Sequence, residues 1–302
     1  MTDERHLIGR RPIHQDKIIG RRPIHQDNNK WAIYRMHYGL DFLSQSIDSI
    51  RDDVDKIFIC YSLQPWVVKE KVSYLGDEID MPINPERVEE YLKIYDADPK
   101  VHCFRAEFDT PKNQFRQIYD MCCEIENTTP NKVVFIDPDM VYQKGDLGKM
   151  FDEFKKPTPD DTMIPAMTTY QIELWKTFKW RVPQRPRTGP VIWNIDVSPN
   201  FKTTFGPEPD GGSLVIHNDI KNYNFGFCVN PLTMYYKHLA CIQFSATIGD
   251  SIPSQEWYRD KWSTWTPDKE DLEISENYKH TIKRAVPFEM PEKMSVQMHV
   301  EI

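Results

Sequence analysis

The stretch Val133–Tyr142 reads VVFIDPDMVY, and it contains the most informative motif of the chain. Its apolar first half is typical of a strand that is buried on both faces of a parallel sheet. Asp137 and Asp139 follow where that strand ends in a tight turn, so both carboxylates can face one pocket. Like charges held close together need a cation, and carboxylate oxygens suit Mg²⁺ or Mn²⁺ that bridges to substrate phosphates. The sequence therefore predicts a metal and phosphate site at this strand end.

The segments before this stretch alternate between strand patterns and helix patterns. Strands are expected at Trp31–Met36, Lys56–Tyr61, Val101–Phe104 and Lys132–Ile136. Apolar residues spaced by three and four predict helices over 40–54 and 112–126, and a further helix is expected over 85–95. This alternation is typical of an α/β sheet with crossover helices, in which ligands bind at the carboxyl ends of the strands.

The second half of the chain has a different character. After an expected helix over 147–154, short apolar segments at 162–168, 190–195 and 214–217 are separated by Gly and Pro, and a helix follows with Pro231 in its first turn. No linker separates the halves. We therefore predict a single domain over 31–302, with a nucleotide-binding half over 31–154 and an acceptor half with the tail over 155–302.

The N-terminal residues contain a perfect repeat, IGRRPIHQD, at Ile8–Asp16 and again at Ile19–Asp27. Two copies are too few for a repeat architecture, which needs at least about three stacked units. A tandem duplication and a basic contact for an anionic partner both remain open as explanations. We predict that 1–30 form a flexible arm outside the domain.

Composition narrows the range of partners and locations. The net charge of −8 and the pI near 5.6 argue against a nucleic-acid partner. The 6 cysteines include no CxxC pair, which fits reduced thiols in the cytoplasm. The chain has no apolar stretch of about 18 to 20 residues and no apolar region at its N-terminus. We therefore expect a cytoplasmic protein without a transmembrane segment.

A family resemblance is carried by four segments in order: YGLDFLSQSIDSI at 38–50, VDKIFICYS at 54–62, TPKNQFRQIYDMC at 110–122 and VVFIDPDMVY at 133–142. This order resembles the nucleotide-binding half of family-2-like glycosyltransferases with the GT-A fold, well over 31–154 and loosely beyond. The resemblance implies a Rossmann-type mixed sheet flanked by helices. It also implies a nucleotide-sugar donor (a UDP- or GDP-sugar), a carbohydrate or glycan acceptor, and Mn²⁺ or Mg²⁺ as cofactor.

The resemblance also implies roles for single residues. Asp137 and Asp139 would hold the metal and the diphosphate, Tyr61 and Ser62 would lie near the base, and Asn113 and Arg116 would lie near the ribose or the phosphates. Asn113 can equally be a helix cap. A third metal ligand would be a His or a carboxylate, and His280 is the candidate because it lies in a tail that can fold back over the donor.

An inverting transferase also needs a general base near the acceptor hydroxyl. The segment IGDSIPSQEWYRDKW at 248–262 offers Asp250 and Glu256, and we expect the base to be one of them. The acidic dipeptide and the QxxRW motif that are usual in the family are absent, and YRDKW only partly resembles the latter. Inverting and retaining outcomes therefore both stay open.

Two other functions fit parts of the same motif. A haloacid-dehalogenase-type phosphohydrolase has a strand followed by DxDx[T/V], which Asp137–Val141 matches, with Asp137 as nucleophile and Asp139 as general acid. That motif normally opens its fold, whereas about 100 residues with strands of their own precede it here, and Asp160 and Asp161 follow too soon. The second alternative is a carbohydrate-binding protein that keeps the fold without turnover.

Overall fold

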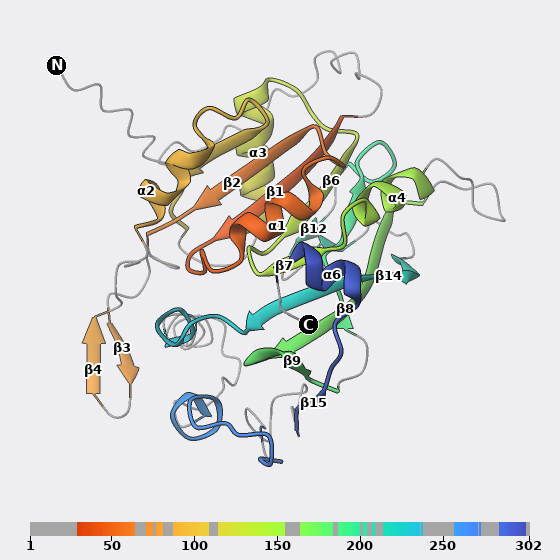
Figure 1. Ribbon diagram of the computed structural model, residues 1–302. Helices are drawn as coiled ribbons and strands as arrows, with labels where there is room; N and C mark the ends of the chain where they lie inside the picture. Colours follow the sequence, from red (N-terminus) through yellow and green to blue (C-terminus); the bar gives the residue numbers. More distant parts are fainter. Residues whose placement is uncertain are drawn as a thin grey trace.

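The computed structural model describes residues 29–63, 71–74, 77–80, 87–108, 114–154, 164–183, 187–199, 202–203, 207–208, 214–235, 237, 257–270, 272 and 284–299. The strands and helices of these ranges are arranged around one large sheet (Figure 1). Among the described residues, no helix has the length and apolar character that a membrane span requires.

One half of the large sheet consists of four parallel strands. They are β1 (Lys30–Met36), β2 (Lys56–Tyr61), β5 (Val101–Arg105) and β6 (Lys132–Ile136). Their order across the sheet is β5-β2-β1-β6, and each pairs in parallel with its neighbour. β1, β2 and β6 form here because short apolar runs, rich in β-branched and aromatic residues, are buried on both faces of the sheet, whereas β5 at the edge is only partly buried.

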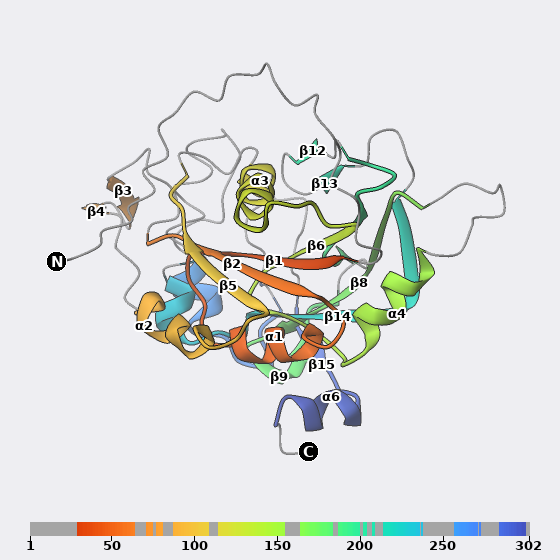
Figure 2. The ribbon, with the colours of Figure 1, turned by 90° about the horizontal axis from the view of Figure 1, so that it is seen from above.

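Each face of the parallel strands is covered by its own helices, as Figure 2 shows. Alternate side chains of β1 point to opposite faces of the sheet. Trp31 and Ile33 pack against α3 (Gln114–Glu126), whereas Ala32 and Tyr34 belong to the core on the other face. That opposite core includes apolar residues of α1 (Leu43–Ile50), α2 (Val88–Leu92), the short 3-10 helix Lys93–Tyr95 and α4 (Asp146–Glu153). The strands are thus held between two apolar layers, and polar residues can lie at the strand ends, outside these layers.

The other half of the sheet is mixed in direction. It contains β7 (Met140–Tyr142), β8 (Ala166–Trp175), β9 (Thr177–Arg181), β10 (Arg187–Thr188), β11 (Ile192–Asn194), β14 (Leu214–Phe227) and β15 (Val286–Pro287). β11 joins the halves by pairing antiparallel with both β6 and β8. β14 pairs in parallel with β8 and antiparallel with β7, so it lies beside the residues that follow the aspartate pair.

Smaller elements complete the described structure. They are the hairpin of β3 (Lys71–Tyr74) and β4 (Asp77–Asp80), the pair β12 (Lys202–Thr203) and β13 (Pro207–Glu208), a π-helical segment Trp257–Trp262, α6 (Glu292–Gln297) and a helical turn over 231–235. An apolar core of the second half includes Trp175, Phe225, Trp262 and Met294.

The predicted fold class, a mixed α/β sheet flanked by helices, is confirmed. β2 and β6 have the predicted bounds, whereas β1 begins at Lys30, inside the range expected for the arm. Residues 1–28 lie outside the described residues. The apolar segments at 162–168 and 214–217 overlap only the starts of longer strands, since β8 continues to Trp175 and β14 to Phe227. The division into a nucleotide half and an acceptor half stays a prediction.

Candidate functional site

The aspartate pair lies where the strand order of the sheet reverses. From β1 the chain continues to β2 and β5 on one side, and then returns to β6 on the other side of β1. In an open α/β sheet such a reversal leaves a crevice outside the carboxyl ends of the two strands, and ligands bind there. Asp137 is the first residue after β6, so it lies at this position.

Asp137 forms an ion pair with Arg35 from the end of β1. Tyr34 pairs with Ile136 in the parallel register, which makes Arg35 and Asp137 the next residues of their two strands. Nη2 of Arg35 lies 3.2 Å from Oδ1 of Asp137. The guanidinium also lies 4.4 Å from the ring centroid of Phe115, a cation–π contact that fixes its orientation.

Asp139 forms an ion pair of its own, with Lys237. Nζ of Lys237 donates to Oδ2 of Asp139 and lies 3.4 Å from the carbonyl oxygen of Gly226. The backbone of Asp139 is fixed too, because its carbonyl oxygen accepts a hydrogen bond of 2.8 Å from the N–H of Phe225 in β14. The Asp139 side chain is only 10% exposed, so its charge depends on this partner.

Gly226 is the residue that makes room beside the Asp139 carboxylate. A Cβ at this position would lie 3.1 Å from Oδ2 of Asp139 and 2.8 Å from Oδ1 of Asn224. A methyl group there would displace the Asn224 side-chain oxygen and press on the Asp139 carboxylate. The backbone N–H of Gly226 donates to the Asn224 side chain over 2.7 Å, which holds this bend of the chain in place.

The donor set of the site fits a hard divalent cation that also binds phosphate. Two carboxylates are present, and the ion pairs engage Oδ1 of Asp137 and Oδ2 of Asp139. Within the part of the chain that the structure describes, no group of three or more His, Cys, Asp or Glu side chains gathers as a metal cage. Mg²⁺ is commonly held by one or two carboxylates, with phosphate oxygens and waters as further ligands. The carboxylates could therefore hold such an ion together with a diphosphate.

A chain of polar contacts connects Asp137 to the end of β2. Arg35 contacts Oε1 of Gln114 at 3.5 Å, and Nε2 of Gln114 lies 3.5 Å from Nε2 of His37. Nδ1 of His37 in turn contacts Oγ of Ser62, which is buried. A neutral imidazole, with one nitrogen as donor and one as acceptor, fits both contacts. Burial, with Arg35 nearby, lowers the pKa of His37 from 6.5 to about 3, so the ring stays neutral near pH 7.

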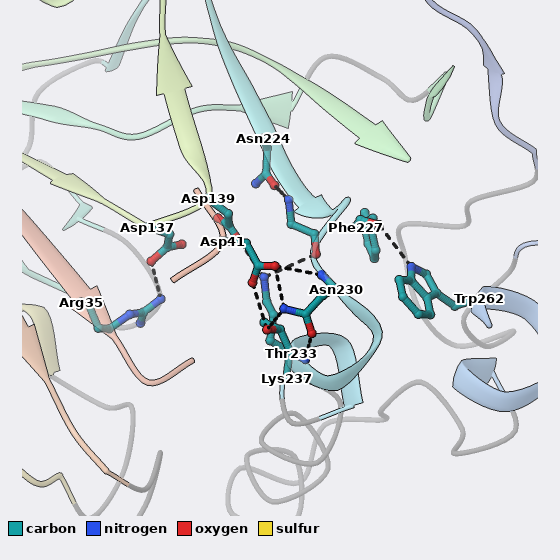
Figure 3. Close-up of polar contacts among 11 residues, drawn as sticks. Arg35, Asp41, Asp137, Asp139, Asn224, Phe227, Asn230, Thr233, Lys237 and Trp262 are labelled. Atoms are coloured by element: carbon teal, nitrogen blue, oxygen red, sulfur yellow. Dashed lines mark hydrogen bonds and ion pairs between the residues drawn. The ribbon is translucent and has the colours of Figure 1, made fainter. Parts of the chain in front are cut away.

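Behind Lys237, the start of its helical segment is tied to the loop after β1 (Figure 3). Oδ1 of Asp41 accepts from the backbone N–H and the side-chain amide of Asn230, at 3.0 and 2.7 Å. Oδ2 of Asp41 accepts from Oγ1 of Thr233 at 2.9 Å. Asn230 itself is the N-cap, since its Oδ1 accepts from the N–H of Thr233 at 3.0 Å.

The structure places some of the predicted site residues near the aspartate pair and others elsewhere. Ser62 belongs to the polar chain just described, and Tyr61 lies beside it with its hydroxyl 3.4 Å from Oε1 of Glu89. Arg116 pairs with Asp120 at 3.0 Å and with the carbonyl oxygen of Pro199 at 3.3 Å, and Arg35 stands beside Asp137 instead. Asn113, Asp250, Glu256 and His280 lie outside the described residues.

Three residues of the site were missed by the sequence reasoning: Arg35, His37 and Lys237. Arg35 had a signal, because it is a charged residue near the end of an otherwise apolar strand. The cap had one too, since Asn230 precedes Pro231 and stands three residues before Thr233. Lys237 had none, because it meets Asp139 from 98 residues away.

Comparisons with known proteins give structural matches alone. No protein-family model and no curated protein matches the sequence. Among solved structures, the fold is similar to residues 1–349 of S. aureus TarS, at 8% identity and a TM-score of 0.37, over 71% of this chain and 65% of that chain. It is also similar to the mannosyltransferase PcManGT from Pyrobaculum calidifontis, in complex with GDP-Man and Mn²⁺, at 12% identity and a TM-score of 0.41, over 74% of this chain and 65% of that chain. The chain thus spans slightly less than two thirds of each solved protein.

Proposed function

We propose that this protein is a glycosyltransferase that moves a sugar from a UDP- or GDP-sugar to a hydroxyl group of a carbohydrate or glycan. The observation that carries this proposal is the aspartate pair at the switch point of the sheet, with one cation beside each carboxylate. A nucleoside diphosphate is the ligand class that needs both a divalent metal and fixed positive charges at such a strand end.

In this proposal Asp137 and Asp139 hold Mn²⁺ or Mg²⁺, and His280 is the candidate for a third ligand. When bound, the metal supplies Lewis-acid stabilisation of the charge on the departing nucleoside diphosphate. Arg35 and Lys237 add positive charge near the same phosphates, in a site where a partly buried charge is screened less than in water.

The nucleoside of the donor would lie toward the end of β2. Tyr61 and Ser62 remain the proposed neighbours of the base, with His37 between Ser62 and Gln114. Asn113 and Arg116 remain proposals for the ribose or the phosphates. Arg35 is the stronger candidate of the two arginines for the phosphates, because its partner is Asp137 of the aspartate pair, whereas Arg116 pairs with Asp120 on its own helix.

The reaction itself forms one bond and breaks one. The acceptor oxygen bonds to the anomeric carbon, the bond from that carbon to the diphosphate oxygen breaks, and the acceptor proton passes to a carboxylate in an inverting reaction. Asp250 or Glu256 is the proposed base. The Asp137 side chain is 35% exposed, so a donor can reach this carboxylate from solvent.

The test is donor turnover. The protein is incubated with a panel of UDP- and GDP-sugars, with Mn²⁺ or with chelator, and released nucleotide is measured with and without oligosaccharide acceptors. We expect metal-dependent release that Asp139→Asn reduces by at least about 100-fold, since an electrostatic contact to the transition state is lost. Asp48→Asn, at an exposed position of α1, is the matched control and should retain activity. Hydrolysis of a generic phosphomonoester without nucleotide release would instead support the phosphohydrolase.

A further inference from the structure

We propose that Lys237 is a built-in counter-ion that occupies Asp139 in the donor-free protein, and that the metal therefore binds together with the donor diphosphate rather than before it. This inference rests on the proposed function, because it concerns the order in which that site is filled. It assigns Lys237 a role as a positioning residue, which neither the sequence pattern nor the aspartate motif indicates.

Lys237 fits closely beside Asp139. The Asp139 side chain is 10% exposed and the Lys237 side chain 30% exposed, so this pair is partly shielded from water. The ammonium is also held by the carbonyl oxygen of Gly226, a residue at which an added Cβ would press on the carboxylate. Lys237 is thus positioned by the fold, and does not reach Asp139 as a freely moving surface lysine.

Two ion pairs neutralise the two carboxylates of the site. Asp137 with Arg35 and Asp139 with Lys237 form two pairs, so the carboxylates are already neutralised before any ligand binds. A divalent ion that binds both carboxylates must compete with the ammonium for Asp139, which weakens its binding. A lysine ammonium has three donors on a flexible stem, so it can leave the carboxylate and contact an incoming phosphate.

The binding of the metal and the binding of the diphosphate are thermodynamically linked. A diphosphate gives the metal further oxygen ligands and gives Lys237 a new negative partner, so each ligand favours the other. The helical segment that carries Lys237 stays in place during this exchange, because Asp41 and the Asn230 cap fix its first turn. The movement is confined to the lysine side chain.

The experiment measures Mn²⁺ binding to the full chain by electron paramagnetic resonance of the free ion, without turnover. Lys237→Met removes the charge and keeps much of the stem, and Lys237→Arg keeps the charge. Lys221→Met is the matched control, because Lys221 also projects from this half of the protein but lies 4.9 Å over the ring of Tyr170. The folding of each variant is checked by thermal unfolding.

For Mn²⁺ alone, we expect Lys237→Met to bind at least tenfold more tightly than the wild type, whereas Lys237→Arg and Lys221→Met bind like the wild type. Added GDP or UDP should tighten Mn²⁺ binding to the wild type several-fold more than to Lys237→Met. Equal or weaker Mn²⁺ binding by a folded Lys237→Met would overturn the role of Lys237.

The same data separate this inference from the proposed function. If a nucleotide tightens Mn²⁺ binding equally in the wild type and in Lys237→Met, the donor assignment stands and the inference fails. If neither nucleotide affects Mn²⁺ binding to the wild type, the donor assignment fails and the coupling fails with it. Tighter binding of Mn²⁺ alone to Lys237→Met would then still support the counter-ion.

Discussion

Asp41 and Asn230 are 189 positions apart in the sequence, yet the carboxylate of Asp41 accepts two hydrogen bonds from Asn230, at 3.0 and 2.7 Å. One residue follows the first strand of the sheet, and the other caps the helical segment that carries Lys237. The loop after β1 and the lysine beside Asp139 are therefore parts of one hydrogen-bonded unit, which joins the two halves of the chain at the site.

Asp41→Ala should destabilise the protein by about 2 kcal/mol, because it removes the acceptor of hydrogen bonds from Asn230 and Thr233. Urea unfolding monitored by circular dichroism gives this value. Asp48→Ala, an exposed change on α1, should stay within about 0.5 kcal/mol of the wild type. Equal stabilities of the two variants would show that the contact contributes nothing.

Gly226→Ala should weaken Mn²⁺ and nucleotide binding, because its Cβ would meet Oδ2 of Asp139 at 3.1 Å. The overpacking should also destabilise the protein by about 1 to 3 kcal/mol. Gly145→Ala is the control: Gly145 has a φ of +82° and a Cβ there meets nothing within 4 Å. That variant should lose stability through backbone strain and retain ligand binding. Both properties are measured by calorimetry, and intact ligand binding by Gly226→Ala would contradict the assignment.

The stability of the protein should fall in acid partly through His37. The pKa of His37 is about 3 in the folded protein and near 6.5 in an unfolded chain, so between these values the unfolded state binds one proton more. The contribution of the neutral His37 ring to the free energy of unfolding is complete above pH 6.5 and is lost as the pH falls toward 3. The free energy of unfolding of the wild type should therefore fall more between pH 7 and pH 5 than that of His37→Gln. Parallel curves for the two proteins would rule out this role of His37.

Lys176 offers a test of backbone strain away from the aspartates. It has a φ of +60° between β8 and β9, and its Nζ lies 3.4 Å from the ring centroid of Trp262. Both Lys176→Ala and Lys176→Gly lose the cation–π contact, but only glycine relieves the left-handed strain. The glycine variant should be more stable than the alanine variant by about 1 kcal/mol in thermal unfolding. An alanine variant of equal or greater stability would argue against strain at this position.

The first half of the fold could be predicted from the sequence because its signals are local. β2 and β6 are continuous apolar runs that each begin at a lysine, and their bounds agree with the prediction. The apolar segment at 214–217 covers only the start of β14, which continues to Phe227, because many of the later residues of this strand are polar and are placed by pairing with β7 and β8. A short stretch of sequence does not show which distant strand it pairs with.

The same distinction applies to the candidate site. The aspartate pair is visible in the sequence because it follows a buried strand directly. The ion pair of Asp139 with Lys237 and that of Asp137 with Arg35 are tertiary contacts over 98 and 102 positions. Residue type and spacing within one segment could therefore identify the carboxylates and single out Arg35, but could not show which cation pairs with which aspartate.

In the function proposed here, the aspartate pair binds a nucleoside diphosphate through a divalent metal. The most direct test is titration calorimetry of the wild type and Asp139→Ala with GDP and with UDP, each with Mn²⁺ and with chelator. We predict binding of one of the two nucleotides to the wild type that depends on Mn²⁺ and is at least about tenfold weaker, or lost, in the variant, where a metal ligand is missing. Nucleotide binding that is equal in both proteins, or absent from the wild type with Mn²⁺ present, would contradict the account.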